Sequence, residues 1–184
     1  MRVIDITMEL NDRVAVYKSD PHVHVDPYTT VEENGYAVTE LVMGSHSGTH
    51  IDAPSHVLAH GRTVLDIPLD LLIGKCYVAD VDDFDTIPRD TRRLLCKGAK
   101  DPSETLTYEQ SEELVRAGVR VFGTDGMSIG GDEVHRLLLE NSCVILENLV
   151  LGHVDPGDYV LCALPLKVAA DGAPIRACLL PKRS

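Results

Sequence analysis

The stretch His46–His56, H-S-G-T-H-I-D-A-P-S-H, places three histidines and one aspartate close together. Imidazole nitrogen and carboxylate oxygen suit a borderline divalent cation such as zinc or manganese. Gly48 and Pro54 disfavour a regular helix, so we expect a strand end that runs into an irregular loop. On a locally extended chain, His50 and Asp52 point to the same side. The predicted metal ligands in this stretch are His46, His50 and Asp52. The alternative, a surface loop that is rich in histidine by chance, is weaker because histidine is scarce.

The composition is that of a globular protein. The 184 residues fit a single domain, residues 1–184, with a sizeable core. Hydrophobic residues make up 44% and charged residues 25% of the chain. The net charge of −12 argues against binding to nucleic acid or an anionic membrane, because both require basic patches. No apolar run approaches the length of a membrane span, and the N-terminal segment M-R-V-I-D-I-T-M-E-L differs from a signal peptide.

The five cysteines indicate the cellular compartment in which the protein works, because disulfides form in oxidising compartments. Their number is odd and no pair has C-x-x-C spacing, which argues against a disulfide framework or a structural zinc knuckle. Reduced, mostly buried thiols indicate a cytoplasmic protein. The cysteines are Cys76, Cys96, Cys143, Cys162 and Cys178.

Hydrophobic patterning predicts an α/β protein with a mixed sheet, about seven strands and two clear helices. The helix from Thr107 to Gly118 has a capping box at Thr107 and Gln110. A second helix follows Asp132, which we expect as its N-cap, and extends through 140. Strands are expected at 3–10, 36–43, 75–81, 119–123, 143–151, 159–166 and 175–180, while 11–24 and 89–102 are expected to be irregular and 57–74 to hold a possible short helix.

Two further residues could belong to a metal site. His135 falls in the first turn of the second helix, where the helix dipole favours the neutral ring that a metal needs. Glu147 interrupts a nearly continuous apolar run, where a carboxylate is costly unless it is paired or bound to metal. The alternatives are a histidine on a helix surface and a glutamate at an exposed strand end.

Several other polar residues favour simpler interpretations. The glycine-rich loop T-D-G-M-S-I-G-G lacks the lysine of a P-loop and the G-x-G-x-x-G of a dinucleotide fold, so nucleotide binding is not expected. His22 and His24 fit a solvated loop better than a ligand set. His60 fits a surface position, or a position in which it contacts the metal ligands without binding the metal itself.

The motif H-x-G-T-H-x-D-A-P-x-H resembles the signature of the putative cyclase family, which includes bacterial kynurenine formamidases and isatin hydrolases. Later blocks V-H-R-L-L-L, V-I-L-E-N-L, P-G-D-Y-V-L-C-A-L-P-L-K and D-G-A-P-I-R-A resemble the family in the same order. The resemblance covers nearly the whole chain. It implies a swivelling β/β/α fold with a mixed sheet that partly closes on itself and outer helices.

The resemblance also implies roles for single residues. His46 and His50 would bind one divalent metal, zinc or manganese, and His135 a second. Asp52 and Glu147 would bridge the two, although some relatives hold one ion. His56 would be the proton donor and acceptor. Relatives commonly form homodimers or homotetramers.

The implied reaction is hydrolysis of an amide, with metal-activated water attacking a formamide such as N-formyl-L-kynurenine, as in tryptophan catabolism. Kynurenine formamidases generally place Trp or Phe near the start of the chain, whereas this chain has no Trp and two Phe. Tyr17 occupies about that place and is a candidate substrate contact. The alternatives are hydrolysis of a cyclic amide, imide or lactone and a non-catalytic metal-binding protein. Neither Ser45 nor Ser47 lies in a G-x-S-x-G elbow, which argues against a serine hydrolase.

Overall fold

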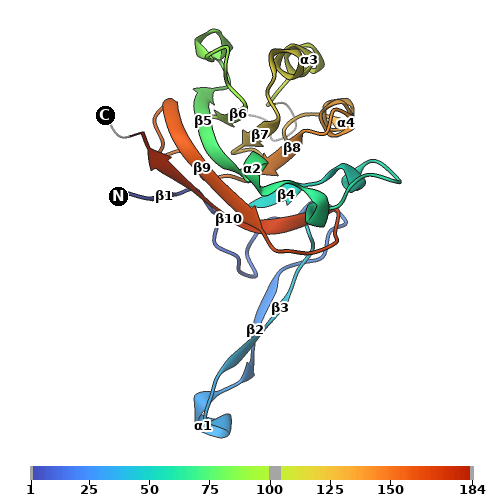
Figure 1. Ribbon diagram of the computed structural model, residues 1–184. Helices are drawn as coiled ribbons and strands as arrows, with labels where there is room; N and C mark the ends of the chain where they lie inside the picture. The colour runs from blue at the N-terminus through green and yellow to red at the C-terminus, as the bar shows by residue number, and fades with distance from the viewer. Residues whose placement is uncertain (1, 100–104, 183–184) are drawn as a thin grey trace.

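A mixed sheet that closes on itself forms the body of the protein in the computed structural model, which describes residues 2–99 and 105–182 (Figure 1). Eight strands lie in the order β1-β10-β4-β8-β7-β6-β5-β9, and an additional pairing of β9 with β10 closes the ring. The strands are β1 (Ile4–Asp5), β4 (His50–Asp52), β5 (Ile73–Asp80), β6 (Arg93–Lys97), β7 (Val121–Thr124), β8 (Val144–Glu147), β9 (Gly157–Pro165) and β10 (Gly172–Pro181).

The ring contains both parallel and antiparallel pairs, and the antiparallel ones are the more numerous. The neighbours from β5 through β8 are parallel, whereas the pairs that involve β4, β9 or β10 are antiparallel. One apolar core fills the inside of the ring, with Ile51 and Leu146 among its fully buried residues. A second core, which contains Phe122 and Leu138, lies between the parallel strands and the helices. This arrangement confirms the predicted mixed sheet with outer helices.

Two helices cover the outer face of the parallel strands: α3 (Tyr108–Ala117) and α4 (Asp132–Glu140). The capping box at Thr107 and Gln110 is present, and Gly118 ends α3 in the left-handed conformation, as predicted. The prediction that Asp132 is the N-cap of α4 is wrong. Gly131 holds that position without a side-chain hydrogen bond, and Asp132 is the first helical residue.

The prediction that 89–102 is irregular is also wrong, because β6 lies inside this range; 100–102 fall outside the described residues. A parallel strand with both faces covered shows no alternation of polar and apolar residues, and the flanking basic residues concealed it. Leu95 faces the inner core while Leu94 faces the helices. The Arg93 guanidinium is satisfied by backbone carbonyls, including that of Leu71 at 2.6 Å from Nε.

The other predicted strands are present, although their bounds differ. The expected strand at 3–10 is reduced to β1, and the one at 143–151 to β8, which ends where Asn148 takes a positive φ of 55°. The apolar segment at 57–74 contains short helical turns, η2 (Val64–Asp66) and α2 (Leu69–Leu72). Two further turns are η1 (Pro54–His56) and η3 (Phe84–Thr86). All five cysteines are free.

An arm projects from the body, formed by β2 (His24–Thr29), α1 (Val31–Asn34) and β3 (Val38–Val42) (Figure 1). Strand β3 was predicted and β2 was not. The two strands pair with each other in a separate two-stranded sheet. Apolar side chains on the arm are exposed, with Tyr28 at 71% and Leu41 at 60%.

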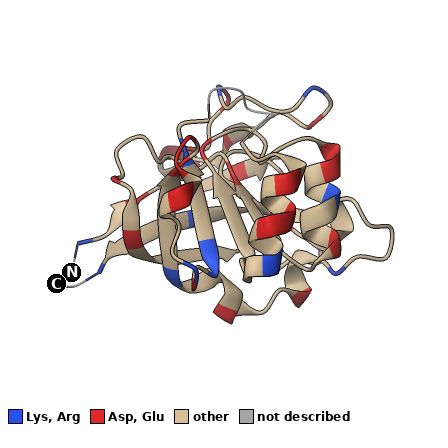
Figure 2. Cartoon of the chain, turned by 90° about the horizontal axis from the view of Figure 1, so that it is seen from above, with Lys and Arg blue, Asp and Glu red and all other residues tan. Residues whose placement is uncertain are grey.

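The charged residues lie over strands, loops and helices alike (Figure 2), and acidic positions clearly outnumber basic ones. No helix of the described part of the chain is long and apolar enough to cross a membrane.

Candidate metal centre

Two short strands bring the central ligands together. Strand β4 lies between β10 and β8 in the sheet, and His50 is the direct partner of Glu147 across the β4–β8 pair. His50 and Asp52 point to the same side, as predicted, and His50 Nε2 lies 3.3 Å from Asp52 Oδ1. All three side chains are buried: Asp52 is 1%, His50 3% and Glu147 5% exposed. Three ionisable groups removed from water at one point require compensation by one another or by a cation.

One carboxylate oxygen of Glu147 makes two polar contacts that hold the side chain in place. Its Oε1 accepts a hydrogen bond from the Ile129 backbone N–H at 2.8 Å and lies 3.1 Å from His135 Nε2. Its Oε2 lies 3.6 Å from His50 Nε2. Glu147 therefore stands at the end of β8, but it is buried rather than at an exposed strand end.

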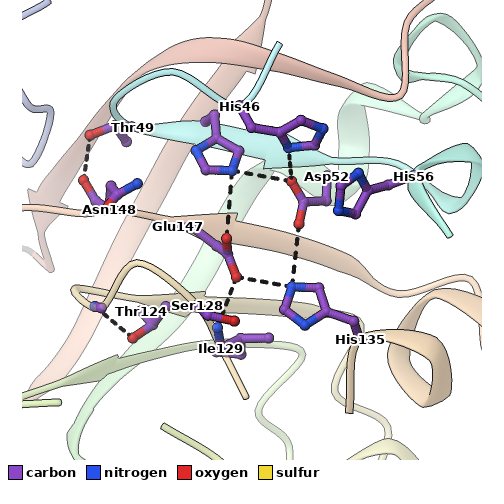
Figure 3. Close-up of polar contacts among 12 residues, drawn as sticks. His46, Thr49, Asp52, His56, Thr124, Ser128, Ile129, His135, Glu147 and Asn148 are labelled. Atoms are coloured by element: carbon purple, nitrogen blue, oxygen red, sulfur yellow. Dashed lines mark hydrogen bonds and ion pairs between the residues drawn. The ribbon is translucent and has the colours of Figure 1, made fainter. Parts of the chain in front are cut away.

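His46 lies in the turn before β4 and contacts a carboxylate with each ring nitrogen. Its Nδ1 is 2.8 Å from Asp52 Oδ1, and its Nε2 is 2.9 Å from Asp171 Oδ2. His56, at the end of η1, lies with its ring centroid 4.1 Å from that of His46, and its Nδ1 is 3.4 Å from the same Asp171 oxygen. Figure 3 shows His46, Asp52, His56, His135 and Glu147 converging on one point.

His135 reaches the cluster from the first turn of α4, with Nε2 3.7 Å from Asp52 Oδ2. The helix dipole was expected to favour a neutral ring, but the neighbouring carboxylates oppose it. Burial lowers the pKa of His135, but the hydrogen bond to Glu147, its charge and that of Asp52 outweigh burial and raise the pKa to about 9. Two nearby carboxylates therefore act more strongly than the dipole.

The residues fit a divalent metal. Within the described residues, two groups have ligand atoms close enough to hold one ion each: His46, Asp52 and His56, and His50, Asp52 and Glu147. Asp52 belongs to both groups. Imidazole and carboxylate together suit zinc or manganese. His50 Nδ1 lies 2.8 Å from the Gly48 carbonyl, a contact that orients Nε2 toward the carboxylates, as in many metal-binding histidines.

The electrostatics of the metal-free cluster show what a cation would replace. Burial lowers the pKa of His50, but hydrogen bonds to Asp52 and Glu147 outweigh it and raise the pKa to about 10. Burial alone would raise the pKa of Asp52, but hydrogen bonds from His46 and His50 lower it well below its ordinary value. Imidazolium protons therefore balance the buried carboxylates.

Metal binding is expected to release protons. Ligation requires neutral imidazole, and His50 and His135, with pKa values of about 10 and about 9, are protonated at neutral pH. We expect release of about two protons per site near pH 7, with affinity that rises with pH until both rings are neutral. Without metal, the stability from these ion pairs is complete below the unfolded pKa and is lost as pH rises through the folded values. Calorimetric titration in buffers of different ionisation enthalpy measures the protons, and binding without proton release would contradict this assignment.

A cleft of about 530 Å³ opens onto the cluster, a size that fits a small molecule. The candidate ligands that line it are His46, His50, His135 and Glu147, and His56 lines it as well. Tyr17 lies at the cleft and is 65% exposed. His22, His24 and His60 are exposed, and the search of the described residues for ligand groups includes none of them. His24 was expected in a loop but is the first residue of β2.

Sequence comparison places this arrangement among known proteins. The profile of the Putative cyclase family matches residues 4–101. The chain is 33% identical to a kynurenine formamidase of Bacillus cytotoxicus over 202 residues, which covers 97% of each chain. It is 35% identical to a kynurenine formamidase of Geobacillus thermodenitrificans over 204 residues, which covers 96% of each.

Solved structures agree. A potential metal-dependent hydrolase with cyclase activity is 28% identical, with a TM-score of 0.78 over 100% of this chain and 99% of the other. An isatin hydrolase bound to the product analogue thioisatinate shares the fold, with a TM-score of 0.76 at 21% identity over 98% of this chain and 92% of that chain. Fold and comparisons define the class of the protein as a hydrolase on the swivelling β/β/α fold. The chain belongs to the Putative cyclase family.

One residue of the cluster, Asp171, was not predicted. It lies in the turn before β10, 125 residues from His46 in the sequence, and its side chain is 44% exposed. An aspartate before glycine is an ordinary turn signal. The only hint in the sequence was that D-G-A-P-I-R-A resembles a family block.

Proposed function

We propose that the protein is a metal-dependent hydrolase that cleaves the C–N bond of a formamide, with N-formyl-L-kynurenine as the leading substrate. The observation that carries this proposal is the shared position of Asp52 in two ligand groups, one of which includes His56, a residue that also lines the open cleft. The whole-chain likeness to kynurenine formamidases supports the choice of bond.

Five residues would hold the metal, and one or two ions of zinc or manganese fit their chemistry. His46 and His50 would bind one ion, His135 a second, and Asp52 and Glu147 both. A divalent cation in this position supplies Lewis acidity, which activates water and polarises a carbonyl. Burial of the carboxylates keeps the field of the cation strong, because little water screens it.

His56 would move the proton. Its ring is the most exposed of the four histidines in the cluster, with 34% of the side chain accessible, and it lines the cleft. Histidine is the side chain that most often both accepts and donates a proton in catalysis. In this proposal His56 takes the proton from water and delivers it to the leaving nitrogen.

The lining of the cleft supports an amino-acid substrate with an aromatic side chain. Arg136 and Asp20 lie along the cleft and carry the charges that an α-carboxylate and an α-ammonium group require. Tyr17 offers a ring on which an aromatic substrate could stack. Because Tyr17 is the single Phe, Trp or Tyr among the described residues that line the cleft, a smaller cyclic amide, imide or lactone is the second candidate.

The test is a substrate panel with metal-loaded and chelator-stripped protein. We expect hydrolysis of N-formyl-L-kynurenine that disappears on stripping and returns with zinc or manganese. Preference for cyclic amides or lactones would select the second candidate. Absence of turnover on any formamide, cyclic amide or ester would favour a non-catalytic metal-binding protein.

We further propose that the protein is a homodimer or homotetramer held in part by the arm of β2, α1 and β3. A two-stranded hairpin is marginally stable in water by itself, and the exposed apolar side chains of this one match a surface that is covered by another chain. Symmetric association of identical chains is the commonest solution.

Light scattering tests the role of the arm. Replacing Tyr28 and Leu41 with serine should shift the protein from an oligomer toward a monomer, because both side chains would lose their apolar partners. Leu166→Ser is the matched control, since Leu166 is a similarly exposed apolar residue on the body. A monomeric wild type, or an oligomer unaffected by the arm variant, would contradict the proposal.

A further inference from the structure

We propose that Asp171 is a positioning residue that orients two functional histidines with one carboxylate oxygen. The proposal rests on the function above, because it gives His46 the role of a metal ligand and His56 that of the proton-transfer group. Asp171 Oδ2 lies 2.9 Å from His46 Nε2 and 3.4 Å from His56 Nδ1. The ring centroids of the two histidines are 4.1 Å apart, so the oxygen serves adjacent rings.

The Asp171 carboxylate is held in place on its other side. Ser45 Oγ donates a hydrogen bond to Oδ1 at 3.0 Å, and the Asp171 backbone carbonyl accepts one from Ala53 N–H at 2.8 Å. Ser45 belongs to the segment that leads into β4, and Ala53 follows β4 directly. The turn before β10 is therefore tied to both ends of the strand that carries His50 and Asp52.

Gly172 lets this turn come close to the ring of His46. A Cβ atom at position 172 would lie 2.6 Å from His46 Cε1 and 2.9 Å from the Ile51 carbonyl oxygen, distances that real Cβ atoms do not show. Glycine is needed here for close approach. The D-G pair thus brings a carboxylate to the histidines with its first residue and makes room with its second.

The contacts assign the ring nitrogens. His46 Nδ1 faces Asp52, in the ligand group, so a His46 ring that holds metal through Nδ1 would donate its Nε2–H to Asp171. In a neutral His56 ring, an Nδ1–H that donates to Asp171 leaves Nε2 as the proton-accepting atom. Histidines that bind metal usually donate their second ring N–H to a carboxylate or carbonyl, and loss of that partner typically weakens metal binding or activity 10- to 100-fold.

The central variant is Asp171→Asn, which keeps the size of the side chain and removes its charge. Competition titration of zinc into metal-free protein should show affinity about 10- to 100-fold weaker than in wild type. On reloading to full occupancy, kcat should fall while KM changes less, because proton transfer acts mainly in the transition state. Nitrogen-15 spectra of histidine-labelled, metal-free protein, recorded at a pH at which the spectra show the His56 ring to be neutral, should show His56 as the Nδ1–H tautomer in wild type and a mixture in the variant.

Ser45→Ala and Asp171→Glu are the matched controls. Ser45→Ala removes a hydrogen bond from the same carboxylate but leaves the two histidine contacts, so a smaller effect is expected. Asp171→Glu restores the carboxylate and should recover part of the activity. Unchanged zinc affinity and His56 tautomer in Asp171→Asn would overturn the proposal. The proposal would also be overturned if Asp171→Asn lost activity only in proportion to a lower melting temperature, because a residue with a merely structural role gives that result.

The zinc titration and the histidine spectra need no substrate. A wild type without hydrolase activity would therefore overturn the proposed function, while the altered zinc affinity and His56 tautomer would still support the role of Asp171.

Discussion

Replacing His56 with alanine should lower turnover of a formamide substrate roughly 10²–10⁴-fold, the usual worth of a positioned proton-transfer group. The variant should keep its fold and its metal, because the five proposed ligands come from the turn before β4 and from β4, β8 and α4. The Michaelis constant should change less than kcat. Steady-state kinetics together with elemental analysis of the same preparation measures both effects.

His60→Ala is the matched control for this variant. His60 is an exposed histidine four residues further along the same segment, and it belongs to neither ligand group. Its replacement should leave turnover unchanged. Loss of metal from His56→Ala would make His56 a ligand, as its place in one group with His46 and Asp52 allows. Full turnover without His56 would contradict its catalytic role.

Replacing Asp52 should have the most complete effect on the centre. Asp52 belongs to both candidate ligand groups and is fully buried, so its loss affects every ion the site holds. Protein with Asp52→Ala, purified without an affinity tag, should contain little metal and show no metal-dependent hydrolysis. Bound metal stabilises the native state by mass action, so metal should no longer raise the melting temperature.

The metal-free form of this variant is informative as well. Removing Asp52 deprives His46 and His50 of one of the two carboxylates that each contacts, which should cost about 1–3 kcal/mol of stability. Asp85→Asn removes a carboxylate from an exposed turn and is the control for charge alone. Metal content in Asp52→Ala equal to that of wild type would rule out Asp52 as a ligand.

The sequence alone predicted those candidate ligands that could be recognised from local backbone geometry or from the energetic cost of burying a charged side chain. His50 and Asp52 lie two residues apart on a strand, and such residues share a face whatever the rest of the chain does. Glu147 could be suspected because a lone carboxylate in an apolar run is expensive. The resemblance to a family then connected these residues with His135, which is far from His50 and Asp52 in the sequence.

Other features depend on contacts that local sequence does not encode. In the sequence Asp171 has the appearance of an ordinary turn residue. It lies next to His46 only because β10 pairs with β4. Strand β6 is buried on both faces and so lacks the alternation that marks a strand. The raised pKa of His135 follows from Glu147 and Asp52 across the cluster, whereas its position in a helix predicted a lowered pKa.

Anomalous diffraction from crystals of the metal-loaded protein, recorded on either side of the absorption edge of zinc or manganese, tests the central claim most directly. We predict one or two peaks enclosed by Asp52 and Glu147 together with His46, His50 and His135, at the cleft that His56 lines. Metal located only elsewhere, for example at the exposed His22 and His24, or no peak at this cluster in fully loaded protein, would contradict the account.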